Sequence, residues 1–382
     1  MINCTRRNFL IGSLSSVFFS GMSFPLASNY KKKKNLIIIN LRGGMDGLSA
    51  VPVIGDKNLI KQRKELILDE TLRLNTDFAL HPKLEFFHEL WKNNQASVIH
   101  ASSIPYTGRS HFDGQNLMES GGNVPYQIKT GWLGRGMKLA NLKGDGLALA
   151  LPMPLLIRGV PMNDNYYPVK GTIPRAEILD EIKRSYIEHN EELLNDTLEI
   201  IKKREFDAYS SRDNFDLALN AGKKLSKPNG PRVAVFEVDG FDTHAAQGAT
   251  NGAHADCLHE FDNILKGLKQ SMNSETFKNS LIVTLTEFGR TIKQNSSNGT
   301  EHGYASAVLM AGGLVKKAQV YSDWPGLKRK ELFEGRDLNS TIDARSIYAS
   351  AMSTVFDLDF KRIQKEVFWG EKLENLSDKL FS

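Results

Sequence analysis

The chain has 382 residues, of which 41% are hydrophobic and 24% charged, and these ordinary values exclude a collagen-like or disordered protein. The formal net charge of +5 falls to +3 without the N-terminal Arg6 and Arg7, so the charge gives no argument for a nucleic-acid partner and we expect none. The two cysteines, Cys4 and Cys257, exclude a disulfide-stapled chain.

Residues 1–27 have the pattern of an export signal. Arg6 and Arg7 form a positive pair of the twin-arginine type, and a stretch of apolar and small residues follows and ends near Ala27. Glycine, proline and serine residues interrupt this stretch, so we expect no stable membrane span. We therefore predict a twin-arginine signal peptide, the twin-arginine export machinery as a partner, and a periplasmic or extracellular location.

Short apolar runs alternate with helical patterns along the rest of the chain. The runs predict buried strands at 36–40, 96–100, 232–238, 280–286 and 305–310. The helical patterns lie at 82–91, 114–118, 254–272 and 344–356. This alternation predicts an α/β fold with a mostly parallel central sheet and helices on both faces. We expect a single domain over 28–382, with a charged, helical, cap-like insertion around 173–225.

Polar clusters follow the predicted strands. Carboxylates and histidines stand after the strands at 36–40, 232–238 and 280–286 and in the next loop, and they are Asp46, Asp242, His244, Glu287, Glu301 and His302. The sequence Arg109-Ser-His-Phe-Asp113 follows the strand at 96–100 and precedes a helix. In such folds the functional groups gather at the carboxyl ends of the strands. Carboxylates and neutral imidazoles are ligands of Zn²⁺, Mn²⁺ and Mg²⁺, so the sequence predicts a metal site with enough ligands for two ions.

The order of several motifs resembles that of one bacterial family. The motifs are Leu41-Arg-Gly-Gly-Met-Asp-Gly-Leu48, Arg109-Ser-His-Phe-Asp113, Gly131-Trp-Leu-Gly-Arg135, Asp242-Thr-His244, Glu287-Phe-Gly-Arg-Thr291 and Gly299-Thr-Glu-His-Gly303. In this order they are similar to domain of unknown function family 1501 (DUF1501), whose members carry twin-arginine leaders. That family is similar to the alkaline phosphatase and sulfatase superfamily, so the resemblance implies an alkaline-phosphatase-like α/β fold.

The resemblance also implies roles for individual residues. The implied ligands of two divalent ions, with Zn, Mn, Mg and Ca not distinguished, are Asp46, Asp242, His244, Glu287 and His302. Ser110 takes the place of the nucleophile at a helix start, and Arg109 or Arg290 could clamp an anion. Simpler roles stay open: Asp46 as a turn former, Ser110 as a helix cap, and the two arginines as ion-pair partners. His111 and His254 could each line the pocket.

These residues predict an exported metal-dependent hydrolase of small phosphate or sulfate esters. A formylglycine sulfatase is disfavoured, because the sequence from Ser110 to Gly114 lacks the required C/S-x-P-x-R pattern. The alternative is a noncatalytic binding or scaffold protein with a degenerate metal site. Two departures favour this alternative: Phe288 follows Glu287 where a histidine is common in the superfamily, and Glu301 stands where relatives in the family usually have an aspartate.

Overall fold

The computed structural model describes residues 33–150, 152–161, 163–165 and 213–382, together with Glu177, Asp180, Glu181 and Arg184. The export signal predicted over 1–27 and most of the insertion predicted around 173–225 lie outside the described residues. Lys34–Ser382 form one compact unit. Among the described residues, no helix combines the length and the apolar character that crossing a bilayer requires.

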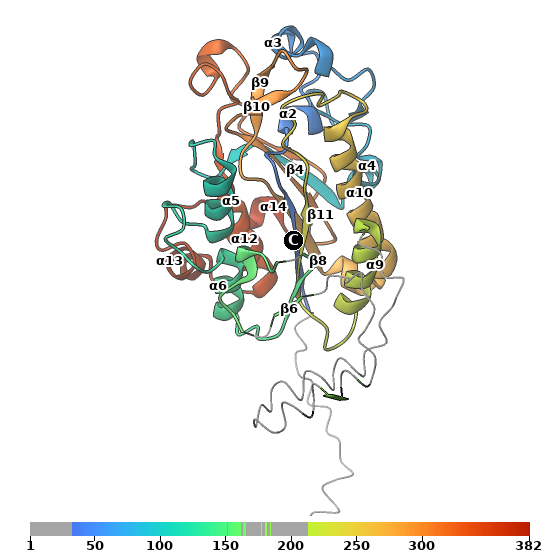
Figure 1. Cartoon of the computed structure of the whole chain (residues 1–382), viewed down its shortest axis with the longest axis vertical. Helices are drawn as coiled ribbons and strands as arrows, with labels where there is room; N and C mark the ends of the chain where they lie inside the picture. The colour runs from blue at the N-terminus through green and yellow to red at the C-terminus, as the bar shows by residue number, and fades with distance from the viewer. Residues whose placement is uncertain are drawn as a thin grey trace, which may run out of the picture. The chain divides into compact units, whose positions relative to one another are not determined.

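A nine-stranded sheet lies at the centre of this unit (Figure 1). Its strands are β1 (Asn35–Leu41), β4 (Ala96–Ser103), β5 (Gly146–Ala148), β6 (Asp164–Asn165), β7 (Val233–Val238), β8 (Ser280–Leu285), β11 (Ser306–Ala311), β12 (Val320–Tyr321) and β13 (Ile342–Asp343). The order is β12-β4-β11-β8-β1-β7-β5-β6, and β13 pairs with β4. Within this sheet β11 runs antiparallel to β4 and β8, and the other pairings are parallel. The predicted α/β fold with a mostly parallel sheet is therefore confirmed.

Helices cover both faces of the sheet, because its central strand is apolar on both sides. Leu36 and Ile38 of β1 belong to the core under α5 (His111–Ser120), α6 (Trp132–Leu139), α12 (Ala344–Phe356) and α13 (Phe360–Glu366). Ile37 and Ile39 belong to the core under α4 (Glu85–Lys92), α9 (Asn214–Leu225) and α10 (Ala253–Ser271). The two sets of helices flank the sheet in Figure 1. All four β1 side chains are fully buried, as expected for a strand between two layers of helices.

Several short elements complete the described chain. They are α2 (Gly47–Ala50), α3 (Lys57–Gln62), η1 (Lys64–Leu66), β2 (Leu72–Arg73), β3 (Ala79–Leu80), η2 (Leu155–Ile157), α11 (Ser274–Lys278), β9 (Arg290–Gln294), β10 (Thr300–His302), η3 (Arg329–Glu331) and α14 (Ser377–Leu380). The strands β9 and β10 form an antiparallel hairpin after β8. Leu48, Leu59 and Ile292 join α2, α3 and β9 in a small third core.

The strand directions bring four chain segments to one edge of the sheet. The strands β1, β7 and β8 are parallel, and β4 points the same way because both β4 and β8 run antiparallel to β11. The carboxyl ends at Leu41, Ser103, Val238 and Leu285 therefore lie along one edge. The segments that leave these ends carry the polar residues singled out in the sequence.

Candidate metal centre

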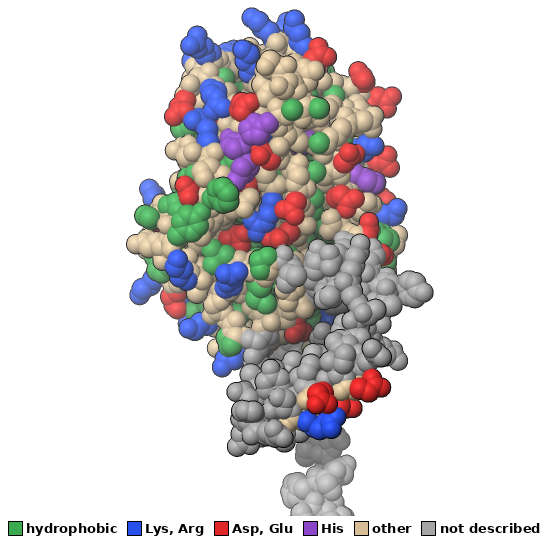
Figure 2. Space-filling model, in the orientation of Figure 1, with side chains coloured by type: hydrophobic (Ala, Val, Ile, Leu, Met, Phe, Trp, Pro, Cys, Tyr) green, Lys and Arg blue, Asp and Glu red, His purple; other side chains and the backbone are tan. Residues whose placement is uncertain are grey.

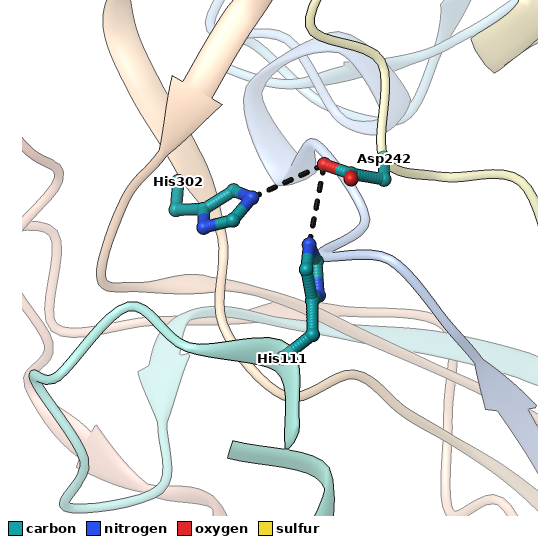
Figure 3. Close-up of side chains that lie close together, drawn as sticks. All are labelled: His111, Asp242 and His302. Carbon is teal, nitrogen blue, oxygen red and sulfur yellow. Dashed lines mark hydrogen bonds and ion pairs between the residues drawn. The ribbon is translucent and has the colours of Figure 1, made fainter. Parts of the chain in front are cut away.

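Three histidine side chains converge on one oxygen of Asp242 at this edge. Asp242 Oδ1 lies 3.2 Å from Nε2 of His111, 3.0 Å from Nε2 of His244 and 3.1 Å from Nε2 of His302. The Nε2 atoms of His244 and His302 are 2.9 Å apart. Figure 3 shows His111 and His302 approaching Asp242 from two different segments. These four side chains are called the His–Asp cluster below.

The other ring nitrogen of each histidine has a fixed hydrogen-bond acceptor. Nδ1 of His111 lies 2.7 Å from Glu287 Oε1, and Nδ1 of His302 lies 2.7 Å from the carbonyl oxygen of Arg109. Nδ1 of His244 lies 2.8 Å from Glu301 Oε2. Each of these acceptors favours the tautomer with the proton on Nδ1. In the neutral rings the lone pairs of Nε2 then face Asp242 and one another.

This arrangement fits a divalent metal ion. Lone pairs and a carboxylate oxygen about 3 Å apart repel one another unless a cation or protons lie between them. A tetrahedral Zn²⁺ site with bonds of about 2.0–2.1 Å places its ligands roughly 3.3 Å apart. The three Nε2 atoms lie 3.0–3.2 Å from Asp242 Oδ1, and the Nε2 atoms of His244 and His302 lie 2.9 Å apart, close to that value. Within the described part of the chain, the buried Nε2 of His111 has no hydrogen-bond partner, and the ligand atoms of His111, Asp242 and His302 lie within 4.8 Å of one another.

Glu287 contacts the cluster through the Nδ1 side of the His111 ring, the side that does not face Asp242. Its carboxylate is fully buried and accepts hydrogen bonds from His111, from Gln115 Nε2 at 3.0 Å and from the Gly43 amide at 2.9 Å. Burial alone would raise the pKa of Glu287, but the hydrogen bonds from His111 and Gln115 outweigh it and hold that pKa below its usual value. A buried carboxylate behind a histidine is a common means of orienting a metal ligand.

The buried Arg290 guanidinium holds Asp242 in place. Its Nη1 donates to Asp242 Oδ1 at 2.8 Å, and its Nε donates to Thr300 Oγ1 at 3.0 Å. Desolvation acts to raise the pKa of Asp242, but the hydrogen bond from Arg290 and nearby positive charge lower it to about 2. Burial lowers the pKa of His302. These two shifts favour the protonation states that a metal requires, an ionised carboxylate and a neutral imidazole. The hydrogen bond with Glu287 instead raises the pKa of His111, so a metal ion would have to displace the proton of that ring.

The residues predicted as metal ligands occupy three different places. Asp242, His244 and His302 lie in the His–Asp cluster, and Glu287 contacts the cluster through His111. Asp46 lies outside the cluster. The structure therefore assembles three of the five predicted ligands around one point, and the roles of all five stay predictions until metal binding is measured.

Asp46 is part of a separate buried network. Its Oδ2 lies 2.7 Å from Arg63 Nη1, and its Oδ1 lies 3.0 Å from Arg63 Nη2, with both side chains about 1% exposed. Ser49 Oγ and Gln247 Nε2 also donate to Oδ2, at 2.8 and 2.7 Å. Asp46 is the N-cap residue of α2 as well. These contacts already supply both of its oxygens with positive charge and hydrogen-bond donors.

Ser110 and Arg109 lie at the start of α5, beside the cluster. Ser110 is the N-cap residue, but its side chain makes no capping hydrogen bond, and its amide donates to the Tyr106 hydroxyl at 3.0 Å. The Arg109 guanidinium pairs with Glu334 and Asp337 at 2.6 and 2.8 Å. Arg109 has a positive φ of 56°, which is uncommon for a non-glycine residue, in the segment whose carbonyl oxygen meets His302.

Sequence reasoning left His111 undecided and gave Glu301 no role. The structure places His111 in the cluster, and the signal for it was its position next to Ser110 at a strand-to-helix junction. Glu301 Oε2 contacts His244 Nδ1, and Glu301 Oε1 accepts a hydrogen bond from Asn295 Nδ2 at 2.7 Å. His254 is buried away from the cluster and accepts a hydrogen bond from the Asp46 amide at 3.2 Å, so it belongs to the core.

Gly43 should be sensitive to any added side chain. Its φ is +114°, and a Cβ atom there would lie 2.4 Å from the Asp242 amide nitrogen. We expect Gly43→Ala to lower the free energy of unfolding by about 3 kcal/mol, from backbone strain and the clash together. Gly55→Ala is the control, because Gly55 has a φ of +69° but open space around its Cβ position, and it should cost only about 1 kcal/mol. Equal losses in denaturant titrations would show that the close approach to Asp242 has no effect.

Comparison with known proteins links part of the chain to one family. Residues 223–365 match the family described as "Protein of unknown function (DUF1501)". This stretch contains Asp242, His244, Glu287, Arg290 and His302. No curated protein matches the sequence.

Several solved structures resemble the chain at low identity. Murine ectonucleotide pyrophosphatase/phosphodiesterase 5 has a TM-score of 0.43 and 9% identity, over 91% of this chain and 100% of that one. The C-terminal periplasmic domain of EcEptC from Escherichia coli has a TM-score of 0.43 and 10% identity, over 90% and 88%. Alkaline phosphatase from the Antarctic bacterium TAB5 has a TM-score of 0.38 and 12% identity, over 88% and 99%. Such low values leave the chemistry of this chain to be argued from its own residues.

Proposed function

We propose that this protein is an exported, metal-dependent hydrolase of phosphate or sulfate esters. The observation that carries the proposal is the convergence of three Nε2 atoms on Asp242 Oδ1, with each Nδ1 atom held by its own acceptor. A divalent ion held there would supply the positive charge that stabilises an oxyanion and lowers the pKa of a nearby hydroxyl. The export signal predicted over 1–27 supplies the argument for location.

Ser110 is the proposed nucleophile. It directly precedes His111 of the cluster, it is partly exposed, and its hydroxyl makes no capping bond to α5. The amino terminus of α5 favours a negative charge beside Ser110, because the first backbone N–H groups of a helix have no partner within the helix. A phosphate or sulfate ester brings such a charge together with an electrophilic centre for the serine oxygen to attack.

The remaining residues of the site orient these groups. Glu287 fixes the ring of His111, Glu301 fixes His244, and Arg290 holds the carboxylate of Asp242. The guanidinium groups of Arg109 and Arg290 already have carboxylate partners, so the proposal assigns neither of them to clamping the substrate. The two-ion form of the site stays a prediction, and the number of ions bound per chain tests it.

Ser110→Ala should lower the turnover of 4-nitrophenyl phosphate or 4-nitrophenyl sulfate at least about 100-fold in protein loaded with Zn²⁺ or Mn²⁺. Metal content should not change, because Ser110 is not among the four donors. Ser274→Ala is the control, since Ser274 is exposed on α11, and it should retain the wild-type rate. Metal binding without turnover of either ester by the wild type would favour the noncatalytic alternative, and unchanged turnover in Ser110→Ala would remove the serine from its role.

A further inference from the structure

A group of exposed hydrophobic side chains, called the hydrophobic patch below, lies on α5 and in the loop that follows it. It consists of Phe112, Val124 and Tyr126, which are 80%, 53% and 49% exposed. Figure 2 shows hydrophobic side chains over the α5 region next to the histidines. Half of the large hydrophobic side chains that stand exposed in the described chain belong to this patch. Grouping of this kind marks a binding surface more often than single exposed residues do.

A hydrogen bond holds Tyr126 against α5, the helix that carries Phe112. Phe112 follows His111 directly, so their Cα atoms are about 3.8 Å apart. Phe112 and Asn116 lie one turn apart on the same face of α5. Asn116 Oδ1 accepts a hydrogen bond from the Tyr126 amide at 2.7 Å, which brings the loop after α5 against this face. Tyr126 has a φ of +62°, so the loop holds it in a conformation uncommon for its residue type.

The size and the position of the patch favour a small ring over a protein partner. Three side chains expose on the order of 300 Å², whereas a stable protein interface buries about 800 Å² on each partner. Two of the three side chains are aromatic, and aromatic side chains pack favourably against other rings in offset-stacked or edge-to-face arrangements. The patch also begins at the residue that directly follows His111 on α5.

We infer that Phe112 and Tyr126 form a platform for the ring of a phosphate or sulfate ester whose anionic group lies at the His–Asp cluster. This inference rests on the proposed function and narrows its substrate class to esters that carry a ring, aromatic or sugar. Phe112 contacts the organic group of the substrate and takes no part in bond cleavage. Its removal should therefore change the preference among esters and leave metal binding unchanged.

The test measures equilibrium binding to zinc-loaded full-length protein by calorimetry. The probes are phenylphosphonate for an aromatic ring, the non-hydrolysable phosphonate analogue of glucose 1-phosphate (a C–P bond in place of the ester bond) for a sugar ring, and methylphosphonate as the anion without a ring. Phe112→Ala should weaken the binding of at least one ring probe fivefold to tenfold and that of methylphosphonate less than twofold. The ring probe that loses more affinity identifies the type of ring. Phe112→Tyr keeps an aromatic face and should bind like the wild type.

Ile60→Ala is the matched control, because Ile60 is 46% exposed on α3, away from the patch, and its removal should change no affinity. Equal losses for ring and ringless probes in Phe112→Ala, or no loss for any probe, would overturn the platform while metal and anion binding still support the proposed function. Failure of the wild type to bind zinc or any of the probes would instead overturn both. Loss of self-association in Phe112→Ala, with all probe affinities unchanged, would show that the patch binds a second copy of the chain.

Discussion

His302→Ala should lower the affinity of the protein for Zn²⁺ by more than about 100-fold. The change removes a donor whose Nε2 lies 3.1 Å from Asp242 Oδ1 and 2.9 Å from His244 Nε2, and it also removes the hydrogen bond to the Arg109 carbonyl oxygen. Loss of a residue that only orients a ligand typically costs 10–100-fold in metal affinity, so loss of a ligand should cost more. Competition with a chromogenic chelator gives the affinity of wild type and variant under the same conditions.

His259→Ala is the control for His302→Ala. His259 is exposed on α10 and lies outside the cluster, so the variant should bind zinc like the wild type. Thermal melting in the presence of a chelator should show both variants folded, because the His302 side chain is only partly buried. Equal zinc affinity of His302→Ala and wild type would mean that the cluster does not bind the ion.

Arg63→Met should destabilise the protein by about 3–5 kcal/mol. Both Arg63 and Asp46 are buried, and removal of the arginine leaves an ionised carboxylate without its charge partner. The backbone carbonyl groups of Thr291 and Ile292 also lose their hydrogen bonds from the guanidinium group. A loss of this size should lower the melting temperature by roughly 5–10 °C.

Two comparisons separate the buried pair from a general effect of losing an arginine. Arg362→Met removes an exposed ion pair with Glu366 one turn away on α13, and it should change stability by less than about 0.5 kcal/mol. Asp46→Leu combined with Arg63→Met removes both buried charges and should recover part of the loss. If Arg63→Met melts at the wild-type temperature, the network around Asp46 contributes little to the fold.

Much of the fold could be predicted from residue patterns. The strands predicted at 36–40 and 96–100 match the buried strands β1 and β4, and the helix predicted at 344–356 matches α12. These elements are apolar runs or helical patterns whose burial follows from local sequence. The direction of β11 could not be predicted, because an apolar run does not reveal whether its neighbours are parallel.

The sequence predicts which segments gather at the site, but it does not predict which side chains contact one another there. Asp242, His244 and His302 follow strand ends, and the sheet brings such ends together. No local pattern reveals which way a side chain points at a helix start, so His111 could not be told from a core histidine. The ion pair of Asp46 with Arg63 could not be predicted from the sequence either, because it depends on the packing of α2 against the segment after α3.

The most direct test of the metal site is the X-ray absorption spectrum of the zinc-loaded wild-type protein. The structure predicts a shell of nitrogen and oxygen ligands at about 2.0–2.1 Å, with the outer scattering of three imidazole rings. The same spectrum from His302→Ala should retain two rings at most. A wild-type spectrum without imidazole scattering, or a protein that retains no zinc after dialysis, would contradict the claim that His111, His244, His302 and Asp242 bind a metal ion.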